Sequence, residues 1–338
     1  MSLYAKITCG YTYCQEVTLE EDNMKTVKLS RCHSELLLAG VIVARAISYL
    51  FSKLILEGMG MFNLLGVRFC LAFALLALLF FPRLKSANRN TVLAGAVMGG
   101  MYFLVVTAEL SGLKRMASGN ASFLVNTAIV LVPLLQAAIK RQFPEKKVIL
   151  SVLLCFLGVG VLTLGEGIAF GPGERWCLLA AFLYACTILI TDRLSHSGID
   201  TLAAGVIQVG MIGVLSLASS FLTESPRLPN GTMECFGILM LALVCTGFGF
   251  TLQPVAQSGT TAERAGMFCA LNPMVAAGLG VVFLQEAFTA KTLLGGILIL
   301  LGILIAELPN QQKNPCYKRK TKNTAADFHT FVQNRLPH

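Results

Sequence analysis

The sequence predicts an all-α polytopic membrane protein with ten transmembrane helices arranged as two inverted five-helix repeats. The first observation is composition: 55% of the 338 residues are hydrophobic, only 13% are charged, and the mean hydropathy is +0.70. Soluble chains are about 25% charged. The second is a series of ten apolar segments of the length that crosses a bilayer, about 20 residues. The third is the uneven distribution of Lys and Arg between alternate connections.

The ten expected spans follow one another through short connections. Spans three and four, and spans eight and nine, are separated only by tight turns. In chain order the expected ranges are 36–53, 61–81, 91–110, 118–139, 148–165, 176–192, 201–222, 233–256, 262–284 and 291–307.

Orientation follows from the basic residues, because Lys and Arg are in excess in cytoplasmic connections. With the N-terminus inside, the cytoplasmic side holds nineteen Lys and Arg, and the opposite side holds six. Both termini are therefore expected in the cytoplasm, and the net charge of +9 needs no nucleic acid to explain it. The expected parts are an N-terminal tail at 1–35, a first repeat at 36–165, a second repeat at 166–308 and a basic C-terminal tail at 309–338.

The N-terminal tail is polar and lacks the apolar core of a signal peptide. Met24 opens a segment typical of a membrane-protein start. Residues 1–23 are therefore expected to be a start-site extension or a dispensable tail.

The two halves of the sequence resemble each other at an offset of about 140 residues. The alignment places Arg68 opposite Gln208, and Pro133 opposite Pro273. Five spans per half is an odd number, so the second half must cross the membrane in the opposite direction. Such inverted repeats alternate access around a midplane site, which favours a carrier over a receptor or scaffold.

Two long segments carry a family resemblance. One reads "SKLILEGMGMFNLLGVRFCLAFALLALLF", and the other, at 252–308, reads "LQPVAQSGTTAERAGMFCALNPMVAAGLGVVFLQEAFTAKTLLGGILILLGILIAEL". Together they resemble the two repeat signatures of the drug/metabolite transporter superfamily, EamA type. The resemblance covers about residues 36–308. It implies a ten-helix inner-membrane carrier that exports amino acids or other small metabolites, driven by a proton gradient or by exchange.

The resemblance also carries over individual positions. The matching residues are Arg68, Gln208, Gln253, Gln257, Pro273 and Glu286. The chain departs from the family at Arg45, where tryptophan is usual, and at Asn272, where glutamate is common. Both departures change the polarity of a cavity between the helices.

Arg45 lies near the middle of the first span, where a charge costs about 2.5–3.5 kcal/mol. It either binds an anionic substrate group such as a carboxylate or phosphate, through two parallel hydrogen bonds, or pairs with Glu109. Glu109 lies about 10 Å nearer the outer face by helical rise. The alternatives are compatible, because a pair that breaks when substrate arrives couples binding to movement.

Arg68 and Glu109 each have two interpretations. Arg68 lies about 10 Å inside the outer end of span two, so it either binds substrate or extends to the interface. Glu109 either carries a coupling proton as a partly buried carboxylate or lies at a wet helix end near Lys114 and Arg115.

Uncharged polar residues inside the spans of both halves are predicted to line a substrate pathway. For any single residue, interhelical hydrogen bonding is the alternative. Ser48 and Tyr49 share the helix face of Arg45, and the two prolines are expected to bend or break their spans. The remaining candidates are Tyr102, Asn126, Tyr184, Gln208, Gln253 and Asn272.

No cofactor, metal ion or catalytic residue is expected. All four histidines lie outside the spans, and no glycine-rich segment has the strand–turn–helix setting of a phosphate-binding loop. Most cysteines lie in apolar runs, where the thiol behaves as a small hydrophobe. The glycines are expected to serve helix packing, as at Gly95 and Gly99 in "GAVMGG".

The leading hypothesis is a secondary transporter in the cell (inner or plasma) membrane that moves a small polar or amphipathic metabolite outward. Its expected partners are that small molecule and the lipid bilayer, with no nucleic acid, and a homodimer is left open. The alternative is a membrane-embedded enzyme acting on a lipid-linked substrate. Such an enzyme needs paired carboxylates or a histidine cluster at one interface, and the sequence offers neither.

Overall fold

The computed structural model describes residues 31–141, 143–144, 146–163, 171–195, 199–249 and 272–307. Within these ranges every regular element is a helix. Both predicted tails, as well as Gln253 and Gln257, lie outside the described residues.

The first half of the chain forms a series of helices whose bounds follow the predicted spans to within a few residues, apart from an earlier start of the first. A short additional helix, α3, connects the second and third spans. The helices are α1 (Arg31–Leu56), α2 (Met61–Leu79), α3 (Phe81–Lys85), α4 (Arg89–Leu113), α5 (Ser118–Asn126), α6 (Ala128–Ile139) and α7 (Lys146–Thr163).

The second half repeats this pattern over its described residues. One stretch, η1, is a π-helix that continues directly from α10. The helices are α8 (Pro172–Ser195), α9 (Thr201–Thr223), α10 (Thr232–Met240), η1 (Leu241–Phe248), α13 (Asn272–Leu284) and α14 (Ala290–Glu307).

Long apolar helices dominate the described chain. Six helical segments are long and apolar enough to cross a membrane, and three shorter apolar helices accompany them. Their outward faces carry large apolar side chains such as Leu78, Phe156 and Leu222, which are 76%, 72% and 85% exposed. An apolar surface of this extent suits contact with lipid acyl chains. The helices are therefore long and apolar, as the composition predicted.

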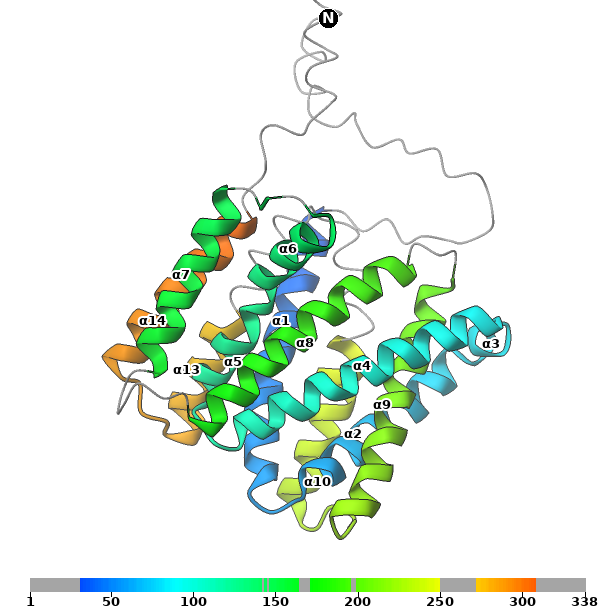
Figure 1. Ribbon diagram of the computed structural model, residues 1–338. Coiled ribbons are helices and arrows are strands. Elements are labelled where there is room, and N and C mark those ends of the chain that lie inside the picture. Colours follow the sequence, from blue (N-terminus) through cyan, green and yellow to red (C-terminus); the bar gives the residue numbers. More distant parts are fainter. Residues whose placement is uncertain are drawn as a thin grey trace, which may run out of the picture.

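The helices of the two halves interdigitate. Figure 1 shows α7 beside α14 at one edge of the bundle, and α4 packs against both α8 and α9. α2 packs along α9, and α5 packs against α13. Two large apolar clusters lie in the interior of the described chain: one includes Leu65 and Phe69 of α2, and the other includes Leu124 of α5 and Ile299 of α14. Each cluster joins helices from both halves.

The segment predicted as one span at 118–139 is divided into α5 and α6 at Thr127. Pro133 lies inside α6; it has no N–H, and its ring crowds the carbonyl four residues earlier. At the break the Thr127 hydroxyl donates to the Leu124 carbonyl at 2.6 Å, and Asn126 Nδ2 donates to the Ser122 carbonyl at 2.7 Å. Side chains thus bind backbone acceptors where the helix is interrupted, which is six residues before Pro133, and α6 continues through the proline itself.

Gly95 and Gly99 bring α4 against α9, as predicted. A Cβ at Gly95 would lie 2.8 Å from the Ala204 carbonyl oxygen, and one at Gly99 would lie 2.8 Å from the Gln208 carbonyl oxygen. Real Cβ atoms do not approach so closely. Only glycine therefore permits this spacing of the two helices.

Gly99→Ala is expected to destabilise the protein by about 1–3 kcal/mol, because the added methyl group must push α4 away from α9. Thermal unfolding of the purified protein in detergent measures the effect. Gly100→Ala is the matched control, since a Cβ there meets nothing within 4 Å. The control is expected to be neutral or stabilised by up to about 1 kcal/mol, the helix-propensity difference. Equal melting temperatures for the two variants would contradict the close contact.

Candidate functional site

A small pocket of about 50 Å³ lies between α1, α2, α4 and η1. A site of this size holds a few water molecules, whereas pockets for drug-sized ligands are about 300–1,000 Å³. The polar part of its wall is Arg45, Ser48, Tyr49, Ser52, Arg68, Tyr102 and Glu109. The apolar part is Leu65, Phe69, Val106, Leu110, Leu113 and Cys245. The wall of the pocket is therefore partly charged or polar and partly apolar.

Six of the residues singled out in the sequence meet at this pocket, and a seventh contacts two of them. Arg45 Nη1 donates a hydrogen bond of 3.4 Å to the Tyr184 hydroxyl, and the guanidinium carbon lies 5.9 Å from the centre of that ring. The Tyr102 and Tyr184 rings meet edge to face, with centroids 5.8 Å apart. Tyr184, on α8 in the second half, therefore contacts two residues of the pocket wall without lining the pocket itself.

Glu109 is held from the neighbouring helix. The Tyr49 hydroxyl of α1 donates a hydrogen bond to Glu109 Oε1 of α4, and both residues line the pocket. The carboxylate therefore faces the pocket rather than forming only a wet helix end near Lys114.

Arg68 is turned into the protein. Its side chain is only 6% exposed, and its Nε donates a hydrogen bond of 2.8 Å to the Thr246 hydroxyl of η1. Its guanidinium carbon lies 5.2 Å from the centre of the Phe69 ring. The alternative that Arg68 extends to the membrane interface is therefore wrong.

Three predicted residues lie elsewhere. Asn126 and Asn272 are buried together around Ser122, whose hydroxyl accepts Nδ2 hydrogen bonds of 3.3 and 3.4 Å from them. Gln208 is half-buried on α9, where its backbone carbonyl faces Gly99 of α4. The asparagines join α5 to α13 in the way that interhelical hydrogen bonds do. A substrate role for these three residues and for Gln253, which lies outside the described residues, stays a prediction.

Two polar residues at or beside the pocket were not predicted: Ser52 lines it, and Thr246 of η1 accepts a hydrogen bond from Arg68. Ser52 lies one turn beyond Ser48 and Tyr49 on α1, so the same helical spacing would have found it. Thr246 had no such signal, because its position depends on the π-helix η1. The i to i+5 hydrogen bonding of a π-helix changes which side chains face inward, and short π-helical stretches are frequent at functional sites.

Two carboxylates cap helices to which they do not belong, at the end of the bundle where α1 meets α2. Glu224 ends α9, and its oxygens accept hydrogen bonds from the backbone N–H groups of Phe62 and Asn63 at 3.1 and 2.8 Å. α2 has no side-chain cap of its own, because its N-cap is Gly60. A carboxylate suits this place, since the first N–H groups of a helix lack partners and carry partial positive charge. We call this contact the Glu224 clamp.

The Glu286 clamp repeats the arrangement at α5. Glu286 follows α13 and accepts hydrogen bonds from the Ser118 backbone N–H at 2.9 and 3.0 Å and from the Ser118 hydroxyl at 2.6 Å. Lys53 of α1 pairs with the same carboxylate at 2.5 Å and donates to the Met116 carbonyl at 2.8 Å. A Cβ at Gly280 would overlap this carboxylate. The clamp therefore joins α1, α5 and the end of α13.

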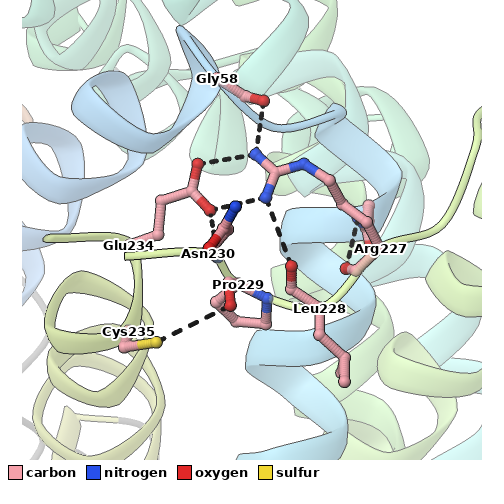
Figure 2. Close-up of polar contacts among 8 residues, drawn as sticks. Gly58, Arg227, Leu228, Pro229, Asn230, Glu234 and Cys235 are labelled. Atoms are coloured by element: carbon pink, nitrogen blue, oxygen red, sulfur yellow. Dashed lines mark hydrogen bonds and ion pairs between the residues drawn. The ribbon is translucent and has the colours of Figure 1, made fainter. Parts of the chain in front are cut away.

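The α9–α10 connection reinforces the Glu224 clamp. Figure 2 shows Arg227 bonded at once to the Gly58 carbonyl, at 2.6 Å, and to both oxygens of Glu234, at 2.7 and 2.8 Å. The Asn63 amide donates to the Arg227 carbonyl at 2.9 Å. The connection between α9 and α10 is thus attached to the connection between α1 and α2.

The Glu286 carboxyl is tuned by its surroundings. Burial alone would raise its pKa, but the hydrogen bonds from Lys53 and Ser118 outweigh burial and hold the pKa below its ordinary range. The clamp is therefore made by the ionised carboxylate.

Comparisons with known proteins extend over most of the chain. The family profile of EamA-like transporters matches residues 34–164 and again residues 171–308. An uncharacterized transporter of Archaeoglobus fulgidus is 28% identical over 280 residues, covering 83% of this chain and 87% of the relative. A protein of Salmonella typhimurium named a probable amino-acid metabolite efflux pump is 26% identical over 280 residues, covering 78% of this chain and 91% of that protein. A solved crystal structure matches with a TM-score of 0.58 at 19% identity, over 82% of this chain and 98% of the other, which is a likeness of fold.

Glu286→Gln is expected to destabilise the protein at neutral pH by about 1 kcal/mol, the typical value of a helix cap. Because the folded-state pKa of Glu286 is depressed, its stabilisation is complete above the ordinary carboxyl pKa of about 4.3 and is lost as the pH falls through the depressed value. The melting-temperature difference between wild type and variant is therefore expected to be constant from about pH 8 to 5 and to shrink below that. Glu57→Gln, at an exposed carboxylate, is the control. A difference that persists at the lowest pH would contradict the clamp.

Proposed function

Because this chain belongs to the EamA-like transporter family, as its repeat signatures predicted, we propose that it is a secondary active transporter that exports a small metabolite. It is a multi-pass membrane protein of transporter type. The solute is amino acid-like or another small polar or amphipathic molecule. The observation that carries the proposal is the pocket, where charged groups of α1, α2 and α4 meet inside helices that face lipid. Ionisable groups inside a membrane protein are costly and mark solute or proton pathways.

We propose alternating access between two inverted five-helix halves. If the short helix α3 is left out, and α5 is counted with α6 and α10 with η1, the described helices number ten, which supports the ten predicted spans. Helices at equal places in the two halves pack together: α2 with α9, α5 with α13, and α7 with α14. The contact of α1 with η1 has its counterpart in that of α4 with α8. This exchange of equivalent contacts supports a twofold relation, and the family profile matches twice along the chain.

We place the end where α1 meets α2 on the outer face of the cell membrane, with both termini in the cytoplasm. The excess of Lys and Arg on the other side supports this orientation. The Glu224 and Glu286 clamps then tie α2 to α9 and α5 to α13 at the outer face. The pocket of about 50 Å³ is smaller than a metabolite, so solute passage requires these helix pairs to separate at one face at a time.

We assign Glu109 the coupling proton, because it is the one carboxylate that lines the pocket among the described residues. Protonation of Glu109 removes the acceptor charge that Tyr49 binds. Proton binding from one side thereby changes a contact between α1 and α4, which is the kind of local event that biases a two-state equilibrium.

Purified protein in proteoliposomes is expected to exchange labelled for unlabelled amino acids or related metabolites and to accumulate the label transiently against its gradient. Empty liposomes give the background. Glu109→Gln is expected to keep this exchange, which needs no net proton movement, and to lose uptake driven by an imposed pH gradient. Glu57→Gln, at an exposed carboxylate outside the pocket, keeps both. The absence of exchange across a broad metabolite panel would overturn the proposal, and a chemically altered product would favour the membrane-embedded enzyme.

The orientation has its own test in the thiols. Cys235 is exposed near the start of α10, at the end assigned to the outer face. A variant that keeps only Cys235 is expected to react with a membrane-impermeant maleimide on intact cells. A matched variant that keeps only Cys316, in the C-terminal tail, is expected to react only after permeabilisation. The reverse pattern would place the clamps on the cytoplasmic side.

A further inference from the structure

Arg68 keeps most of its hydrogen-bonding capacity for the pocket. A guanidinium has five N–H donors in a planar fork. The Nε donor binds Thr246 at 2.8 Å, and within the described part of the chain the two terminal nitrogens have no hydrogen-bond partner. The residue is 94% buried by its 6% exposure, and it forms part of the pocket wall. Four donors on a fixed, buried plane are therefore available to whatever enters.

The hydrogen bond to Thr246 and the ring of Phe69 fix that plane. The Thr246 hydroxyl accepts a hydrogen bond from Nε of the guanidinium, and the centre of the Phe69 ring lies 5.2 Å from the guanidinium carbon. A pre-positioned fork loses little side-chain freedom when it binds a planar anion, which is why arginine grips carboxylates through two parallel hydrogen bonds. Arg45 differs from Arg68, because its terminal nitrogen Nη1 already donates a hydrogen bond to Tyr184 of α8, whose ring packs against Tyr102 of α4.

The charges around the pocket favour a single negative group. Among the described residues, Arg45 and Arg68 face it with one carboxylate, Glu109, which accepts a hydrogen bond from the Tyr49 hydroxyl. The carboxylate of such a solute would pair with the buried guanidinium of Arg68. This pairing would offset the free-energy cost of removing the guanidinium charge from water. A second carboxylate would meet Glu109 at close range in a medium of low dielectric constant.

We propose that Arg68 binds the carboxylate of the transported solute through its two terminal nitrogens, so that the pocket selects organic acids with one carboxylate and an apolar side chain. The apolar part of the wall, formed by Leu65, Phe69, Val106 and Leu110, receives the side chain when the helices separate and widen the pocket. Amino acids and simple monocarboxylic acids both satisfy this description. The proposal rests on the proposed transport function and deepens it, because it assigns the anion to Arg68 where the sequence favoured Arg45.

The test compares acids with their amides. Purified protein in detergent is heated with 4-methylpentanoate, L-leucine and a series of further monocarboxylates from two to nine carbons, each beside its primary amide. Acids that fit are expected to raise the melting temperature, whereas the amide of the same shape does not, because it lacks the charge that Arg68 binds. Succinate and inorganic phosphate serve as the dianionic and phosphate probes and are expected to have no effect. The comparison needs no variant, so it stands even if a substitution at Arg68 fails to fold.

Variants then locate the anion. Arg68→Gln is expected to weaken the binding of the best acid by about thirtyfold or more, the usual consequence of removing one partner of a buried charged pair. Arg68→Lys, which keeps the charge but loses the fork, is expected to lie between wild type and Arg68→Gln. Arg89→Gln, at an exposed cation outside the pocket, is the matched control and is expected to bind as wild type does.

The outcomes separate the two proposals. Three results overturn the assignment of Arg68. The first is that amides stabilise the protein as much as acids do, and the second is that phosphate stabilises it while carboxylates do not. The third is that acid binding is lost in Arg45→Gln but not in Arg68→Gln. Exchange of a neutral or cationic solute in proteoliposomes with unchanged affinity in Arg68→Gln overturns it too, while leaving the transporter function intact. Acid binding without any exchange by the same protein supports the assignment and overturns the transport proposal.

Discussion

Lipid supplies no hydrogen bonds, so the charges inside the spans of this chain must find their partners within the protein, and the helix ends beside the lipid are also completed by protein groups. The two clamps show how this is done at the helix ends. α2 and α5 begin without a side-chain cap of their own, and carboxylates from the ends of α9 and α13 supply the missing acceptors. The same contacts that complete the helix ends also join helices of the two halves. The same hydrogen bonds therefore satisfy the helix ends and hold helices of the two halves together.

The pocket follows from the same constraint. Each ionisable group in it is held by a side chain of another helix: Glu109 by Tyr49, Arg45 by Tyr184, and Arg68 by Thr246. The first of these pairs lies within the first half, and the other two reach across to the second half. A site built between two halves changes its geometry when the halves move, which is the requirement for alternating access.

The sequence predicted most of the helix bounds that the structure describes, and part of the site. Apolar runs determine spans directly, so ranges such as 201–222 lie within a residue of the observed α9. Arg45, Ser48 and Tyr49 were grouped correctly because helical spacing places them on one face. The clamps were beyond such reasoning, because Glu224 reaches a helix 161 residues away and no local pattern pairs them. Asn126 and Asn272 were assigned to the pathway on polarity alone, and polarity does not distinguish a cavity wall from a hydrogen bond between helices.

The hydrogen bond from Arg68 to Thr246 joins positions 178 residues apart, one on a regular α-helix and one on a π-helix. If η1 slides along α2 by a fraction of a helical turn, the Nε donor loses its acceptor and the guanidinium plane is free to rotate. Affinity for an anion on that plane would then differ between the two positions of the helices. Release of the cargo would be a by-product of the very displacement that opens its exit, and the protein would need no separate trigger for unloading.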